Sequence, residues 1–219
     1  MMGMVYYSYD TRSLIDQENN MTAAQGSAAR LVEVALAEVG TIEGPKDNET
    51  KYGKFTKSNF QPWCGSFCMW VANEAGVKIP NTVYTPSGAQ AFIKAGSWQM
   101  AEVATPEVGD IAYFDFPSDG VDRISHVGIV VAVNTDGTVN VVEGNTSSDK
   151  KGDQRNGGEC CLKNRAYKKK NGSKLRRSQI VGIVGFGRPT FGKSVVKKAA
   201  APVKKAVTKS GGGKTSAVK

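Results

Sequence analysis

The chain has 219 residues, of which 40% are hydrophobic, and its 29 Lys and Arg against 20 Asp and Glu give a formal net charge of +9. This length favours a single medium-sized domain with terminal extensions. No apolar run approaches the roughly 20 residues that a membrane-spanning helix needs, so we expect no membrane insertion. The first 20 residues lack the basic and apolar regions of a secretory signal. We therefore expect the protein to stay in the cytoplasm of the cell that makes it until it is released.

The positive charge is concentrated in the C-terminal third. Residues 1–148 carry 9 basic and 17 acidic side chains, residues 149–187 carry 11 and 3, and residues 188–219 carry 9 and none. The net charges are therefore −8, +8 and +9. This asymmetry predicts an anionic partner for the C-terminal end rather than for the whole protein. The imperfect repeat VKKAAAP and VKKAVTK has low complexity and predicts a disordered Lys-rich tail over 189–219.

The N-terminal half has the pattern of helices. Residues 1–21 are polar and without periodicity and predict a flexible arm. The Ala-rich stretch 22–39 has apolar residues at helical spacing and predicts the first helix. A turn-rich segment over 41–60 leads to a second amphipathic helix that begins near Cys64. A short helix is expected over 87–95.

The second half has the pattern of strands. Five strands are expected, over residues 107–116, 125–133, 138–143, 159–167 and 179–186. The sequence NTDG between the second and the third is a strong hairpin signal. Because helices come first and antiparallel strands follow, the order predicts an α+β domain over residues 22–188, with N-terminal helices packed on an antiparallel β-sheet.

Cys64 is the candidate nucleophile. Pro62 marks the start of its helix, so Cys64 falls in the first turn, where free backbone N–H groups and the helix dipole stabilise a thiolate. The chain has one histidine, His126, as a candidate base. The other cysteines are Cys68, Cys160 and Cys161. A zinc site from these residues is conceivable, but their spacing matches no common zinc motif, and Cys68 is expected in the core.

The hairpin predicts which residues join Cys64. With a loop over 134–137, His126 falls opposite Asn145, and Glu143 lies two residues away on the same face. A loop of odd length or a bulge would break this arrangement. We expect the helix of Cys64 to pack over this face. The set supplies the thiolate, the base and the orienting polar group that cysteine nucleophiles need. Taken singly, each residue also has a simpler interpretation: His126 as a surface or core residue, Glu143 as a solvated side chain and Asn145 as a turn residue.

Four segments carry a resemblance to a known family. PWCGSFCMW, GDIAYFDF, SHVGIVV and VVEGNTS resemble, in order and spacing, the CHAP family of cysteine- and histidine-dependent amidohydrolases and peptidases, over residues 28–188. The resemblance implies a papain-like fold and hydrolysis of an amide bond in bacterial peptidoglycan. It implies Cys64 as nucleophile, His126 as general base and Glu143 as the residue that orients the histidine. Asn145, just beyond, is expected to share the orienting role.

The resemblance also guides the expectations for ligands. Some family members bind calcium through an Asp- and Gly-rich loop just before the cysteine. The nearest acidic group here, residues 47–49, lies further upstream and lacks alternating carboxylates, so we expect no calcium and no other cofactor. Tyr52 and Trp63 are candidate substrate-binding residues, although packing is the simpler role for Trp63.

Two hypotheses for the function stay open. The first is a monomeric peptidoglycan amidase or endopeptidase, either a phage endolysin or a virion-associated lysin, whose basic tail concentrates it on anionic wall polymers. The second is a phage protein that binds DNA or another anionic polymer through a tail similar to those of linker histones, with the CHAP-like domain of secondary importance. A third interpretation of the tail is a solubilising extension.

Overall fold

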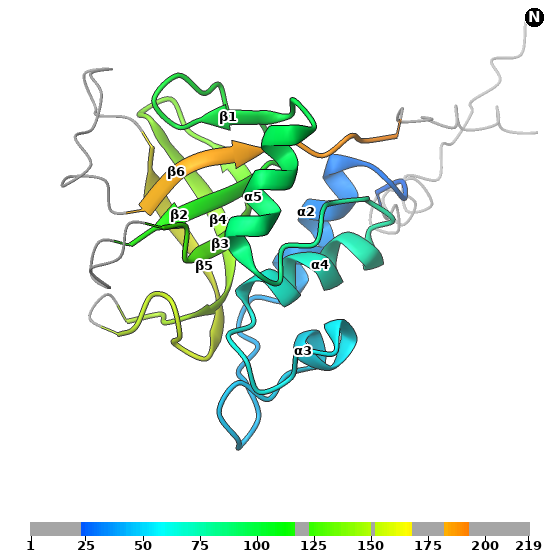
Figure 1. Ribbon diagram of the computed structural model, residues 1–219, viewed down its shortest axis with the longest axis vertical. Helices are drawn as coiled ribbons and strands as arrows, with labels where there is room; N and C mark the ends of the chain where they lie inside the picture. Colours follow the sequence, from blue (N-terminus) through cyan, green and yellow to red (C-terminus); the bar gives the residue numbers. More distant parts are fainter. Residues whose placement is uncertain (1–22, 117–122, 150–151, 168–181, 193–219) are drawn as a thin grey trace, which may run out of the picture.

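The computed structural model describes residues 23–116, 123–149, 152–167 and 182–192 (Figure 1). Within these residues all helices precede all strands, and the strands form one antiparallel sheet. The predicted α+β class is therefore confirmed. The predicted N-terminal arm and nearly all of the Lys-rich tail lie outside the described residues. No helix in the described part is long and apolar enough to cross a membrane.

The helical part contains one element more than predicted. Its described helices are α2 (Ala28–Ala37), α3 (Lys51–Thr56), α4 (Cys64–Glu74) and α5 (Thr85–Lys94). The helix predicted over 22–39 is α2, and it begins only at Ala28. The Ser27 side chain caps it there, because it accepts a hydrogen bond from the Arg30 N–H. Helix α3 lies in the segment predicted as turn-rich. Thr50 caps its N-terminus, and Lys57 in a left-handed conformation ends it.

The sheet holds the five predicted strands and one more. Its strands are β1 (Trp98–Met100), β2 (Ile111–Asp115), β3 (His126–Val133), β4 (Thr138–Thr146), β5 (Glu159–Ala166) and β6 (Gly182–Gly187). Their order across the sheet is β1-β6-β2-β3-β4-β5. The predicted strands correspond to β2 to β6, whereas the three-residue β1 was not predicted. Strand β6 lies between β1 and β2, so the last strand of the described part is held inside the sheet.

The two faces of the sheet bury different clusters. Val127 and Val142 belong to the cluster that packs with the helices, and Figure 1 shows α2 and α4 on that side of the sheet. Val130 and Val141 belong to a second cluster, which is rich in aromatic residues and contains no residue of the helices. Because side chains alternate along a strand, His126 at the start of β3 lies on the face of the second cluster.

The β3–β4 hairpin reaches the predicted register by an unpredicted route. Val133 pairs with Val139 rather than with Thr138, because the loop contains an odd number of residues. A bulge between Val130 and Ala132 then shifts the register back by one residue. The two irregularities cancel, so the end of the hairpin away from the loop keeps the predicted pairing.

The folded domain extends past its predicted end at residue 188. Phe191 packs against the core, and the Gly192 N–H donates to the Gly26 carbonyl at 2.9 Å. Arg188 is itself structural, because its Nε and Nη2 donate to the two carboxylate oxygens of the buried Asp110, each at 2.9 Å. The segment after β6 therefore ties the end of the domain to its beginning.

Candidate active site

Cys64 is the first residue of α4, and its neighbours fix where that helix starts. Trp63 occupies the N-cap without a side-chain capping bond, so no side chain at that position takes the first N–H groups of the helix. The indole of Trp63 is buried, and its Nε1 donates to Glu43 at 3.1 Å. Gly65 allows close packing, since a Cβ there would lie 2.0 Å from the Thr82 carbonyl oxygen. The start of α4 is thus fixed by packing on both sides of Cys64.

His126 lies between Cys64 and Glu143. Its ring is fully buried, with centroid distances of 5.5 Å to Phe114 and 5.6 Å to Phe116. Nε2 is 3.1 Å from Oε2 of Glu143. The other ring nitrogen, Nδ1, has no hydrogen-bond partner among the described residues, and Cys64 is near enough to His126 to influence its charge. The structure therefore brings together three of the residues that the sequence predicted.

The approach of α4 differs from the prediction. The helix was expected to pack over the face of the sheet that carries His126, but the helices cover the opposite face. Cys64 reaches the histidine because it stands at the very N-terminus of α4, next to the start of β3. This placement leaves the thiol at the edge of the sheet, where Cys64 lines a cleft although the residue is only 3% exposed.

The acidic groups on either side of His126 favour the protonated, positively charged form of its ring. Burial alone lowers the pKa of His126, but the negative charge and hydrogen-bonding capacity of Cys64, together with the bond to Glu143, raise this pKa to about 9. Burial raises the pKa of Glu143, and hydrogen bonds from Arg165 and His126 more than reverse this and lower it. The ring is therefore held as an imidazolium between two acidic groups.

Arg165 on β5 is the site residue that the sequence did not predict. Its Nε donates to Oε1 of Glu143 at 2.7 Å, and its Nη2 donates to Oε2 at 2.6 Å. This fork satisfies a carboxylate that is completely buried. The only signal in the sequence was a basic segment, which composition assigned to an anionic partner. The contact itself depends on how β4 and β5 pair, which no local pattern specifies.

Asn145 does not take the orienting role expected of it. Its Nδ2 donates to Asn48 at 3.2 Å and to Asn156 at 3.0 Å, and its Oδ1 accepts from the Gly158 N–H at 3.3 Å. The reason is a bulge in β4 after Glu143, where Asn145 adopts a left-handed conformation with φ of 59°. Within the described part of the chain, only Glu143 hydrogen-bonds the histidine ring. Asn145 instead joins two loops beside the site.

Tyr52 and Trp63 do not line the site either. Both side chains are fully buried, and their rings stack at 5.2 Å. The Tyr52 hydroxyl donates to Glu38, and burial followed by this bond raises the pKa of Tyr52. The predicted substrate-binding role is therefore wrong for both residues in this structure. They form the packed support beneath the start of α4.

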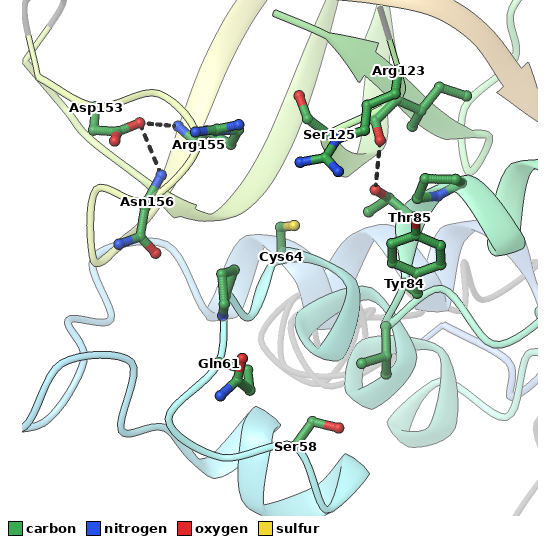
Figure 2. A pocket seen from close by; sticks show the side chains of 14 residues that line it. Ser58, Gln61, Cys64, Tyr84, Thr85, Arg123, Ser125, Asp153, Arg155 and Asn156 are labelled. Atoms are coloured by element: carbon green, nitrogen blue, oxygen red, sulfur yellow. Dashed lines mark hydrogen bonds between the residues drawn. The ribbon is translucent and has the colours of Figure 1, made fainter. Parts of the chain in front are cut away.

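A cleft of about 640 Å³ opens over Cys64 (Figure 2). Its lining residues are Ser58, Gln61, Pro62, Cys64, Val83, Tyr84, Thr85, Pro86, Arg123, Ile124, Ser125, Asp153, Arg155 and Asn156. Figure 2 shows two walls beside the thiol, one with Asp153, Arg155 and Asn156 and the other with Tyr84, Thr85, Arg123 and Ser125. Sequence reasoning missed both walls, because they combine loops with the first residues of α5, and their positions depend on the elements around them. Arg123 and Arg155 come from different walls and line the same cleft as Cys64.

The remaining cysteines are unlike Cys64. All four are free thiols, and Cys68, Cys160 and Cys161 lie outside the cleft. Burial raises the pKa of Cys68 well above its ordinary value and that of Cys161 to about 11, which keeps both thiols protonated at neutral pH. Among the described residues, no group of three or more His, Cys, Asp or Glu side chains is arranged to hold a metal ion.

Comparison with known families agrees with this geometry. Residues 56–145 match the family model of the CHAP domain. This part of the chain is a CHAP domain. The match contains Cys64, His126 and Glu143, whereas Arg165 lies beyond it. A CHAP domain has a papain-like fold and suggests a hydrolase that acts on peptidoglycan. None of the curated proteins matches the chain.

Proposed function

We propose that the CHAP domain is a cysteine-dependent amidase or endopeptidase that cleaves one amide bond of bacterial peptidoglycan. The observation that supports this most is the position of Cys64, at a helix N-terminus, in an open cleft and beside the buried pair of His126 and Glu143. A thiolate and an imidazolium in this arrangement supply both the nucleophile and the proton that amide cleavage needs.

The geometry supports the following reaction. The Cys64 thiolate attacks the carbonyl carbon, and the oxyanion that forms accepts a hydrogen bond from the backbone N–H of Cys64 at the start of α4. His126 then gives its proton to the leaving nitrogen, the C–N bond breaks, and a thioester with one half of the substrate remains. The neutral histidine takes a proton from water, and the hydroxide attacks the thioester. The C–S bond breaks, the thiolate is restored, and the carboxylic acid product leaves and loses its proton to solvent.

The cleft suits an acidic peptide. Arg123 and Arg155 line its two walls, and the carboxylate of Asp153 accepts hydrogen bonds from the backbone N–H groups of Arg155 and Asn156 at 2.8 and 3.0 Å. The stem peptides of peptidoglycan carry free carboxylates, which arginine binds well. We infer that the substrate lies across Cys64 with its peptide part between the two arginines.

The biological role that fits is that of a phage lysin. Many members of the family that the motifs resemble are endolysins or virion-associated lysins. On this proposal the protein waits in the cytoplasm of the producing cell or travels in the virion, works as a monomer, and uses its Lys-rich tail to approach anionic wall polymers. The alternative, a DNA-binding protein, is supported only by the composition of that tail.

The test compares two cysteines of the same helix. Cys64→Ala removes the proposed nucleophile, whereas Cys68→Ala removes a buried thiol one turn deeper in α4. Cys64→Ala is expected to lower the release of new amino groups from purified cell walls by roughly 10³-fold or more, as is usual when a nucleophile is lost. Cys68→Ala is expected to remain active.

Mass spectrometry of the fragments released by the unmodified protein identifies the bond that is cut. Full activity of Cys64→Ala would rule out the mechanism. Equal loss of activity in the two variants would show that the helix, and not the Cys64 thiol, is what the reaction requires.

A further inference from the structure

The buried carboxylate of Glu143 is held by more than the histidine. Oε2 faces both Nε2 of His126, at 3.1 Å, and Nη2 of Arg165, at 2.6 Å, while Oε1 accepts from Nε of Arg165 at 2.7 Å. Two of these three contacts come from one guanidinium in its fork geometry. The carboxylate therefore cannot rotate without breaking bonds to Arg165.

We propose that Arg165 is a positioning residue of this active site, which fixes Glu143 in the orientation that His126 requires and supplies the countercharge for a carboxylate buried in the sheet. The proposal rests on the cysteine hydrolase mechanism given above. Arg165 on β5 thereby becomes the fourth member of a series of neighbouring residues that begins at Cys64 on α4 and continues through the histidine of β3 and the glutamate of β4.

The surroundings of Arg165 support a role inside the site. Its guanidinium carbon lies 5.7 Å from the ring centroid of Phe114 and 5.6 Å from that of Phe116, and its side chain is 11% exposed. The same two rings flank His126. One aromatic pair thus encloses both groups that hold Glu143, and it shields their ionic contacts from water.

The energetics explain why the countercharge is needed. A fully buried carboxylate without a partner is strongly disfavoured and takes up a proton. Burial pushes the pKa of Glu143 upward, and hydrogen bonds from Arg165 and then His126 bring it below its ordinary value. The groups acting on the histidine are Cys64 from α4 and Glu143 from β4. Loss of the Arg165 cation therefore raises the pKa of Glu143 and weakens the negative partner that favours a charged His126.

Arg165 also connects the site to one wall of the cleft. Its Nη2 lies 3.3 Å from Oε1 of Gln154, and the Gln154 amide donates to the carbonyls of Asp149 and Gly152 at 2.9 and 3.1 Å. The residues on either side of Gln154 line the cleft. A single guanidinium therefore contacts both the group that orients the base and the loop that borders the substrate.

The experiment measures the reactivity of Cys64 without any wall substrate. Unmodified protein and the variants Arg165→Gln and Arg165→Lys are treated with iodoacetamide from pH 4.5 to 9.5, and peptide fragmentation assigns the label to Cys64. Arg188→Gln is the matched control, because it breaks a similar two-bond bridge to a buried carboxylate, Asp110, outside the site. Gln154→Ala removes the contact of Arg165 with the loop, together with the amide's own hydrogen bonds within that loop, and leaves both bonds between Arg165 and Glu143 in place. Initial rates of wall hydrolysis are recorded in parallel.

We expect Arg165→Gln to move the midpoint of Cys64 alkylation upward by about one pH unit and to lower the hydrolysis rate roughly 10- to 100-fold, the range for residues that orient a catalytic group. Arg165→Lys should recover part of both, because it keeps the charge and loses the fork. Arg188→Gln should lose thermal stability with an unchanged midpoint, and Gln154→Ala should also keep its midpoint.

If Arg165→Gln had the same midpoint of Cys64 alkylation and the same rate of wall hydrolysis as the unmodified protein, the proposal would be overturned. An equal shift in Arg188→Gln or Gln154→Ala would overturn it as well, by assigning the effect to general loosening or to the loop. If Arg165→Gln does not fold, the proposal is overturned by a folded Arg165→Lys whose alkylation midpoint and hydrolysis rate equal those of the unmodified protein. If walls are not hydrolysed at all, the proposed function fails, while alkylation still decides the role of Arg165.

Discussion

At the scale of single residues, His126 links the stability of the protein to pH. Its pKa in the folded protein is about 9, against about 6.5 for an unperturbed histidine. A raised pKa gives stability that is fully present below pH 6.5 and is lost as the pH rises through 9. The full contribution is on the order of 3 kcal/mol. Urea unfolding at pH 6 and pH 9.5 should therefore show lower stability at the higher pH.

Cys64→Ala is the informative variant for this effect. The interaction with Cys64 is the largest influence that raises the pKa of His126. Without the thiol, the difference in unfolding free energy between the two pH values should shrink. A variant with the same pH dependence as the unmodified protein would show that the histidine is not the group responsible.

The same scale shows what the sequence could predict about the site. Cys64 was found because a helix start is a local pattern. His126 and Glu143 share a face as predicted only because the odd-length loop and the bulge in β3 cancel. Arg165 was missed and Asn145 was misassigned for related reasons. The first depends on pairing between β4 and β5, and the second on a bulge that turns a side chain away. Neither feature leaves a local signature in the sequence.

At the scale of elements, the glycines of the strand motifs hold β3 and β4 in close contact. A Cβ on Gly128 would lie 2.6 Å from Cγ1 of Val141 and 2.8 Å from Cγ of Glu143. Gly128→Ala should therefore destabilise the fold by about 1–3 kcal/mol, as overpacking does, and also displace Glu143 and slow hydrolysis. Thermal unfolding and wall hydrolysis check this. Gly192→Ala is the control, because its Cβ would meet nothing closer than 3.7 Å. Unmodified stability of Gly128→Ala would contradict the argument.

The length of an element decides whether a sequence pattern can predict it. The long amphipathic helix and the alternating strands were predicted, since burial of one stripe or one face leaves a clear period. The six-residue α3 and the three-residue β1 were not. Elements this short contain less than two helical turns or too few alternations to show a period, so their formation depends on caps and on neighbouring strands.

At the scale of the whole molecule, the end of the folded domain decides how the tail is to be tested. The sequence placed the boundary at residue 188, where apolar density falls. The structure keeps Arg188 and Phe191 in contact with the domain, since a few anchoring contacts need little apolar composition. A truncation at 188 would therefore remove structural residues together with charge. The proper cut is before Lys193.

The last prediction concerns that cut. Residues 193–219 hold eight lysines and no acidic residue, so their removal subtracts charge without breaking any contact described above. Protein ending at residue 192 should keep its thermal stability and Cys64 alkylation, and should bind purified walls more weakly at low salt, with a smaller loss of binding as salt rises. Wall pull-down over a salt series measures this, and a gel shift with duplex DNA is run beside it. If the protein ending at residue 192 bound walls as before but no longer bound DNA, the result would favour a nucleic-acid partner for the tail, because its lysines would then bind backbone phosphates.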